Sequence, residues 1–275
     1  MDQAFSATAA ISPGLRPSSM RLVVVGGNGF VGSAICRAAV GRGLDVTSLS
    51  RSGLRPAWTT SHAWAQSVNW ERGDALDASS YEEQLAGAGA VVVAVGTPPA
   101  PFQDEAWQAR MNGETSARVV ATAAEQRVPR VVLVGATMPS WLKHVAPGYF
   151  RGKQRGEMAA EEFVAVTPSR NAAIVLRPGA VNGTRYLGTT PIPLWIALSP
   201  AAWLLTTLSP VVDAVVWLLP GLFKGLLVPP VLVEDIACVA IDAVLDDGRR
   251  FEFPVGAATV VDPAQMYNYR RDSPR

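Results

Sequence analysis

Short apolar runs alternate with helical stretches from Arg21 onward. The run LVVVGG at 22–27 is continuously apolar and ends in glycine, as a strand buried on both faces does. Similar runs predict further strands at 44–50, 67–74, 91–96, 130–137 and 172–179. Helical spacing falls between them, in a helix expected over 77–88 and above all in one long helix expected over 104–127. This alternation predicts an α/β fold with a doubly wound, mostly parallel Rossmann sheet.

The stretch after Arg185 has a different composition. Residues 186–212 carry no charge, and 191–233 carry only Asp213 and Lys224. Its length would admit a membrane span, but Pro191, Pro193, Pro200, Pro210 and Pro220 interrupt it, and a spanning helix must satisfy its own backbone. We therefore expect short helices in a small, apolar C-terminal lobe that packs on the sheet, on a partner or in a membrane interface, with a true span as the alternative. Tryptophans that suit a membrane or membrane-protein interface are Trp195, Trp203 and Trp217.

These patterns predict four parts. They are an N-terminal arm (1–20), a nucleotide-binding domain (21–185), the apolar helical segment (186–233), and a C-terminal helix and tail that complete the fold (234–275). The arm is rich in Ala, Ser and Pro, and both a targeting remnant and a plain disordered arm fit that composition.

Composition narrows the function. The formal net charge of +1 gives no electrostatic reason to expect a nucleic-acid partner. The two cysteines, Cys36 and Cys238, lie far apart in helical stretches, and His62 and His144 are isolated as well. We expect no metal site and no disulfide framework, and we expect both cysteines to be small core residues.

The glycine-rich segment 26–32 follows the first strand directly and opens a helix. In this G-x-x-G-x-x-G pattern, Gly26 permits a tight turn, Gly29 lets backbone N–H groups approach a pyrophosphate, and Gly32 allows close packing of the helix. The alternative is a tight turn without a ligand. The context favours a dinucleotide site.

The end of the second strand indicates which dinucleotide. A site for NAD would place an acid there to bind the ribose hydroxyls, whereas this chain has Ser50, Arg51 and Ser52. A guanidinium with two hydroxyls suits a ribose 2′-phosphate, so NADP(H) is favoured over NAD(H). A solvated surface arginine is the alternative.

Several motifs together resemble a known family. They are the segment VVVGGNGFVGSAICRAAVGRGLDVTSLSRSG, the pairs Gly73-Asp74 and Asn112-Gly113, the run Tyr149-Phe150-Arg151-Gly152-Lys153, and Leu176-Arg177-Pro178-Gly179. The chain resembles the atypical, extended-type short-chain dehydrogenases/reductases, and within them an organellar branch. That branch includes plant Rossmann proteins, a fungal protein associated with coenzyme Q biosynthesis and, more distantly, the nucleotide-binding accessory subunit of respiratory complex I.

The resemblance implies roles along the cofactor. Asp74 would bind the adenine edge beside the Ala75 backbone, and Gly96 with Thr97 would line the ribose and pyrophosphate. Lys153 would hold the nicotinamide ribose, and Pro178 with Gly179 would flank the nicotinamide. The full predicted cofactor set is Gly26, Asn28, Gly29, Phe30, Val31, Gly32, Ser50, Arg51, Ser52, Asp74, Ala75, Gly96, Thr97, Lys153, Pro178 and Gly179.

The resemblance also implies catalytic positions. Tyr149 and Lys153 match Y-x-x-x-K, a spacing that puts both on one helix face, where the ammonium is expected to lower the phenol pKa. Thr137 stands where the family has its catalytic serine, only 12 positions before Tyr149. Asn112 matches a position that supports a proton relay in the family, and a buried residue at a helix bend is the alternative. A packed Tyr149 with a ribose-binding Lys153 is the non-catalytic alternative.

Two functions of different class follow. The first is an NADPH-binding accessory or assembly subunit of a membrane respiratory or quinone-synthesis complex. The second is an NADPH-dependent reductase of a hydrophobic carbonyl or quinone-like substrate. The resemblance places either at the matrix side of the mitochondrial inner membrane, or alternatively in the chloroplast.

Overall fold

The computed structural model describes most of residues 20–269. The described residues are 20–99, 103–137, 142–166, 171–194, 196, 230–246, 250–251, 254, 256–267 and 269. Most of the apolar segment, including Trp195, Trp203 and Trp217, therefore lies outside the described residues.

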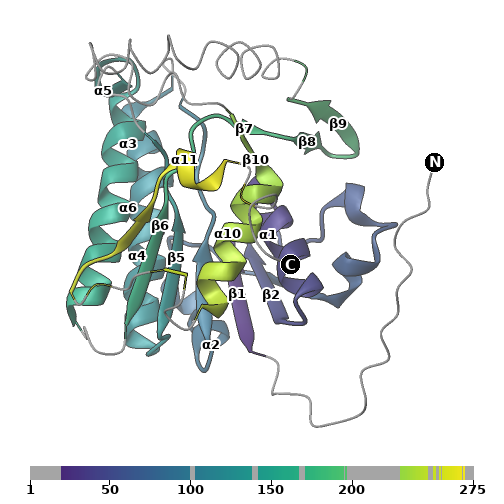
Figure 1. Cartoon of the computed structure of the whole chain (residues 1–275), viewed down its shortest axis with the longest axis horizontal. Coiled ribbons are helices and arrows are strands. Elements are labelled where there is room, and N and C mark those ends of the chain that lie inside the picture. The colour runs from purple at the N-terminus through teal and green to yellow at the C-terminus, as the bar shows by residue number, and fades with distance from the viewer. Residues whose placement is uncertain are drawn as a thin grey trace.

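A seven-stranded parallel sheet forms the centre of the molecule (Figure 1). Its order is β11-β6-β5-β4-β1-β2-β3, with every neighbouring pair parallel. The strands are β1 (Arg21–Val25), β2 (Asp45–Ser50), β3 (Val68–Arg72), β4 (Ala90–Val93), β5 (Arg130–Val134), β6 (Ala172–Leu176) and β11 (Thr259–Val261). The predicted doubly wound Rossmann fold is confirmed, and the order reverses between β1 and β4, where such sheets bind ligands.

Successive side chains of each strand enter different cores. In β1, Leu22 and Val24 join a core with α1 and α10, whereas Val23 and Val25 join a second core with α4 and α6. This follows from the two-residue period of a strand with both faces covered. Because both faces of each strand are covered, the strands appear as uninterrupted apolar runs in the sequence.

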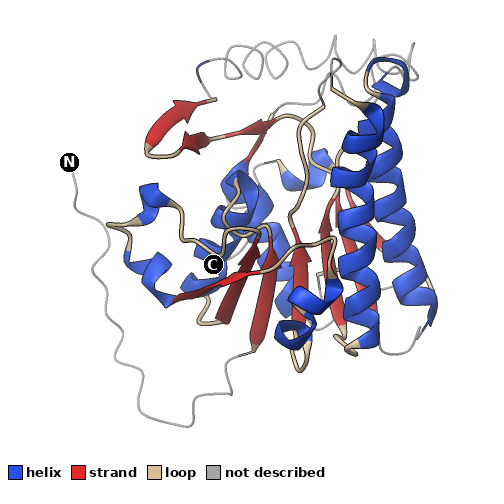
Figure 2. Cartoon of the chain, turned by 180° about the vertical axis from the view of Figure 1, so that it is seen from behind, coloured by secondary structure: helices blue, strands red, loops and turns tan. Residues whose placement is uncertain are grey.

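Helices cover both faces of the sheet (Figures 1 and 2). One layer has α1 (Phe30–Gly41), α10 (Val233–Leu245) and the short α11 (Pro263–Met266), and the other has α2 (Glu82–Leu85), α4 (Thr115–Glu125) and α6 (Pro147–Val166). The connecting elements are η1 (Ala57–Thr59), η2 (Ala63–Ser67), η3 (Ala78–Ser80), α3 (Glu105–Ala109), η4 (Arg110–Glu114) and α5 (Leu142–Val145).

Two predicted helices differ from the structure. The helix expected over 104–127 is divided into α3, a π-helical turn at η4, and α4. The helix expected over 77–88 is reduced to the short elements η3 and α2, because its apolar residues are too few to bury a longer helix.

The beginning of the apolar segment is not helical. Strands β8 (Thr184–Leu187) and β9 (Thr190–Pro193) form an antiparallel hairpin. Proline is tolerated in β9 because an edge strand needs no donor on its free side, so the prediction of helices is wrong for 186–193. The remaining strands, β7 (Val181–Asn182) and β10 (Val231–Leu232), form a short parallel pair.

The C-terminal part of the chain completes the sheet and one of its helix layers. Strand β11 comes from the predicted C-terminal tail and pairs with β6, and α10 packs against α1. Among the described residues, none of the helices combines the length and the hydropathy that crossing a bilayer requires.

Candidate functional site

The glycine turn lies at the point where the strand order reverses. Gly26 has φ +85°, and its N–H donates to the carbonyl of Leu49 at 2.8 Å. A Cβ at Gly26 would lie 2.9 Å from the carbonyl oxygen of Ala94, at the end of β4. Both the left-handed backbone and this close approach require glycine here.

The other two glycines of the motif have separate roles. A Cβ at Gly32 would collide with the carbonyl oxygen of Gly26, so α1 can start against the turn only with glycine at this position. Gly29 is the N-cap of α1, is exposed, and has only the Gly26 oxygen near its Cβ position, at 3.2 Å. The N-terminus of α1 is thus open, and no acidic side chain lies in its first turn. An anion can approach these N–H groups directly.

A cavity of about 190 Å³ extends from this turn along the carboxyl ends of the strands. Predicted cofactor residues that line it are Gly26, Asn28, Gly29, Ser50, Arg51, Asp74, Ala75 and Gly96. The other lining residues fall outside the predicted cofactor set; they are Val25, Leu49, Gly73, Ala94, Val95, Met111 and Thr115. Met111 and Thr115 lie at the π-helical turn, which hydrophobic spacing did not indicate.

Hydrogen bonds connect the loop after β2 to the glycine turn. Asn28 Nδ2 donates to Ser52 Oγ at 3.4 Å, and the Gly53 N–H donates to Ser50 Oγ at 3.2 Å. Arg51 lies between these serines, is exposed and lines the cavity. Among the described residues it has no ion pair, so its guanidinium is available to a ligand.

The opposite wall of the cavity is fixed by Asn112. Its Oδ1 accepts from the Thr97 N–H at 2.9 Å, and its Nδ2 donates to Thr97 Oγ1 and to the carbonyl of Gln108, both at 3.0 Å. Asn112 is fully buried in the π-helical turn. It is the buried residue of a helix bend, and it holds the loop after β4 in place.

Close contacts bring α6 to the same loop. A Cβ at Gly113 would lie 2.7 Å from the carbonyl oxygen of Gly152, and a Cβ at Gly96 would lie 3.4 Å from Lys153 Nζ. Lys153 is buried, and its ammonium donates to the carbonyl of Val134, the last residue of β5, at 3.0 Å. Lys153 therefore contacts both the end of β5 and the loop that follows β4.

Burial shifts the pKa of Lys153. Desolvation lowers the pKa from 10.5 to about 8, while the charge of Glu157, one turn later in α6, opposes the shift. Glu157 also accepts a bidentate pair from Arg177, with Nε to Oε1 at 3.1 Å and Nη2 to Oε2 at 2.7 Å. Glu157 is not among the predicted site residues. Its position four residues after Lys153 on one helix is a signal that the two side chains interact.

Tyr149 lies near Lys153 but is not activated by it. Lys153 Nζ is 6.0 Å from the ring centre of Tyr149. Burial among apolar groups that include Ala136 and Ala146 raises the pKa of Tyr149 to about 12. The expectation that the ammonium lowers the phenol pKa is wrong, because desolvation of the phenolate outweighs a charge at that distance.

Of the remaining predicted residues, Thr137, Pro178 and Phe30 contact neighbouring segments, whereas Gly179 is open. Thr137 Oγ1 donates to the carbonyl of Arg177 at 2.7 Å, and the Thr137 N–H donates to the carbonyl of Pro178 at 2.8 Å. These bonds join the loops after β5 and β6. A side chain at Gly179 would meet nothing within 4 Å, so this position is open. The Phe30 ring packs against Gly183, where a Cβ would lie 3.2 Å from it.

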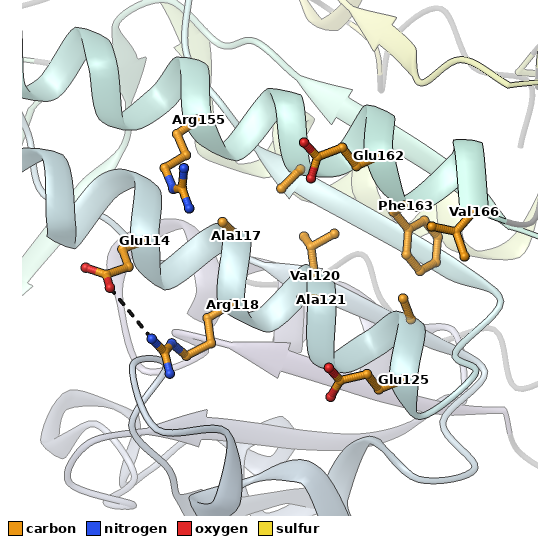
Figure 3. A pocket seen from close by; sticks show the side chains of 12 residues that line it. Glu114, Ala117, Arg118, Val120, Ala121, Glu125, Arg155, Glu162, Phe163 and Val166 are labelled. Carbon is orange, nitrogen blue, oxygen red and sulfur yellow. Dashed lines mark ion pairs between the residues drawn. The ribbon is translucent and has the colours of Figure 1, made fainter.

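A larger hollow of about 530 Å³ lies elsewhere, on the outer side of α4 and α6 (Figure 3). Alanines and Val120 form its floor, and Arg155, Glu162 and the ion-paired Glu114 and Arg118 lie around it. It contains neither a glycine turn nor a strand end, so it lacks the features that hold a nucleotide. Among the described residues, no group of three or more His, Cys, Asp or Glu side chains is placed to hold a metal ion.

Two proteins are similar to this chain in sequence. The chain is 37% identical over 234 residues to an uncharacterized chloroplastic protein of Arabidopsis thaliana, covering 83% of this chain and 73% of that protein. It is 42% identical over 78 residues to MIOREX complex component 2 of Saccharomyces cerevisiae, covering 28% of each.

Solved structures share the fold. UDP-glucose 4-epimerase from Brucella ovis, in complex with NAD, aligns with TM-score 0.61 and 17% identity over 89% of this chain and 77% of that one. BdcA in complex with NADPH aligns with TM-score 0.57 and 17% identity over 89% and 93%. Residues 22–147 match the NAD dependent epimerase/dehydratase family. This range includes the glycine turn and ends before Tyr149. The chain therefore belongs to that family.

Proposed function

We propose that this protein binds NADPH and serves as an accessory or assembly subunit of an organellar membrane complex, holding the nucleotide without turning it over. The observation that supports this proposal is that the Thr137 hydroxyl is engaged by a backbone carbonyl and that Tyr149 is buried. Thr137 Oγ1 donates a hydrogen bond to the backbone carbonyl of Arg177, and burial raises the pKa of Tyr149 to about 12. A phenol of that pKa is a weak proton donor near neutrality.

The cavity fits the adenosine end of a dinucleotide. At about 190 Å³ it is smaller than the roughly 300–1,000 Å³ of typical small-molecule sites. It extends from Asp74 and Ala75 to the open helix N-terminus at Gly29, which suits adenine at one end and pyrophosphate at the other. Arg51 would pair with the 2′-phosphate, which supports NADPH over NADH. Neighbours of the fold that contain NAD and NADPH support a dinucleotide of either kind.

The relatives support an organelle and an assembly. One carries a chloroplastic designation and the other is a component of a complex. We propose a mitochondrial inner membrane location on the matrix side, with the chloroplast as the alternative. The partner would be a respiratory or quinone-synthesis assembly.

A reductase is the second candidate, and the juxtaposition of Tyr149 and Lys153 favours it. Bound NADPH would supply hydride to a hydrophobic carbonyl or quinone-like ligand. Tyr149 would give the proton to the substrate oxygen, and Lys153, whose pKa of about 8 lies near neutrality, would support that transfer.

Oxidation of bound NADPH separates the two functions. Protein loaded with NADPH would be mixed with short-chain quinones and hydrophobic aldehydes, and the absorbance of the reduced nicotinamide would be followed. The accessory function predicts oxidation no faster than in free solution. Oxidation that is faster, and that is lost in Tyr149→Phe, would establish the reductase instead.

A further inference from the structure

Two segments that are far apart in the sequence lie together beyond the β3 edge of the sheet. Trp58, in the connection between β2 and β3, stacks on Tyr186 of β8 with ring centres 4.3 Å apart and planes 8° apart. Trp58 also contacts His62 and Trp64, and Trp64 packs on the core that includes α1. A lone two-stranded hairpin is marginally stable in water, so this aromatic stack holds β8–β9 in position.

The two segments share one sign of charge. Residues 51–70 contain Arg51 and Arg55 but neither Asp nor Glu, and residues 184–196 contain Arg185 but neither Asp nor Glu. All three arginines are exposed. Arg51 lines the nucleotide cavity, whereas Arg55 and Arg185 do not. Arg55 and Arg185 are therefore two exposed cations that the proposed nucleotide site does not use.

Exposed apolar side chains lie in the same segments. Leu54 is 69% exposed, Leu187 at the hairpin turn is 61% exposed, and Ile196 is 60% exposed. Along β8, side chains alternate between faces, so Arg185 and Leu187 point away from the side that Tyr186 presents to Trp58. The outward side of the hairpin therefore combines a cation with a large apolar side chain.

We propose that these residues, Leu54, Arg55, Arg185, Leu187 and Ile196, form a docking surface for an anionic lipid bilayer, which we call the hairpin face. Apolar side chains that enter the headgroup region beside arginines that pair with lipid phosphates are the chemistry of interfacial binding. In the sequence, this hairpin is followed by residues 197–229, whose only charges are Asp213 and Lys224. This inference deepens the proposed function by naming the surface through which the protein reaches its membrane.

Vesicle binding by the purified full chain tests the proposal. Vesicles of phosphatidylcholine alone are compared with vesicles of equal parts phosphatidylcholine and phosphatidylglycerol. The parent chain is expected to bind the anionic vesicles more tightly. The double variant Arg55→Glu/Arg185→Glu should lower that partition coefficient at least about 30-fold, since each arginine near the surface contributes about 1 kcal/mol. Leu54→Asn/Leu187→Asn should weaken binding also at high salt, where the electrostatic part is screened.

The control alters the opposite end of the sheet by the same net charge. Arg118→Glu/Arg155→Glu lies on α4 and α6, at the far side of the molecule from the hairpin (Figure 1), and should keep the partition coefficient of the parent. NADPH affinity should be unchanged in both arginine pairs, which shows that they are folded and separates this test from that of the nucleotide site. The proposal would be overturned if both double variants lost vesicle binding equally, or if Arg55→Glu/Arg185→Glu lost none. It would also be overturned if the parent chain did not bind protein-free vesicles and needed a partner protein.

Discussion

Asn112 and Thr97 exchange two hydrogen bonds across the candidate site. Asn112 Oδ1 accepts from the Thr97 N–H at 2.9 Å, and its Nδ2 donates to Thr97 Oγ1 at 3.0 Å. The π-helical turn at η4 is what places this amide under the loop after β4. The position of Gly96 in the cavity thus depends on a helix distortion.

Replacing Asn112 should weaken both the fold and nucleotide binding. Asn112→Ala leaves the Thr97 N–H without its partner, at a cost of about 1–3 kcal/mol in the free energy of unfolding. Chemical denaturation and calorimetric titration with NADPH measure the two effects. Asn171→Ala serves as the control, because the buried Asn171 donates to the carbonyl of Phe163 at 2.9 Å, away from the cavity. An Asn112→Ala protein with unchanged NADPH affinity would contradict the role given to this amide.

Arg51 should decide between the two dinucleotides. The Arg51→Ala protein is expected to lose about tenfold or more in affinity for NADPH, because a charge-assisted phosphate contact contributes about 1.5–3 kcal/mol. Affinity for NADH should not change, and Arg155→Ala, an exposed arginine on α6, should change neither. Isothermal calorimetry gives all of these constants. Equal affinities for NADPH and NADH in the parent would refute the assignment.

Gly29 should be required for binding but not for folding. In Gly29→Val the new side chain occupies the open N-terminus of α1, where the pyrophosphate would lie, so nucleotide binding should be abolished. Gly41→Val, at the other end of α1 with nothing within 4 Å of its Cβ position, is the matched control. Circular dichroism establishes that both variants are folded. If folded Gly29→Val binds NADPH as the parent does, the turn is purely structural.

Lys153 should make stability depend on pH above pH 8. The unfolded chain keeps the lysine proton up to about pH 10.5, whereas the folded chain releases it near 8. The folded state therefore gains stability as pH rises between these values and loses it as pH falls through 8, with a slope that approaches about 1.4 kcal/mol per pH unit. Lys153→Met removes this contribution. Denaturation of both proteins at several pH values gives the difference, and parallel curves would show that Lys153 is not desolvated.

The sheet and the glycine turn were predictable because local patterns determine them. The apolar run 22–27 specifies a doubly covered strand, and Gly26, Gly29 and Gly32 each answer a local steric demand. Hydrophobic spacing did not indicate the π-helical turn, although a buried helix bend at Asn112 was one of two expectations. At this turn Gly113 lies close to Gly152 of α6, a contact between different helices that no local pattern specifies.

Protonation was the least predictable property of the site. The Y-x-x-x-K spacing correctly places Tyr149 near Lys153, but the pKa of a phenol depends on how deeply the fold buries it. The hairpin at 184–193 was missed for a similar reason. Its stability comes from Trp58, more than a hundred positions earlier in the chain.

Native purification tests the central claim most directly. The protein would be released from organellar membranes in mild detergent, and its bound nucleotide and co-eluting proteins identified by mass spectrometry. We expect NADPH in a one-to-one ratio, in its reduced form, with the chain eluting as part of a large membrane assembly. A nucleotide-free chain that elutes alone from the aqueous fraction as a monodisperse monomer would contradict it.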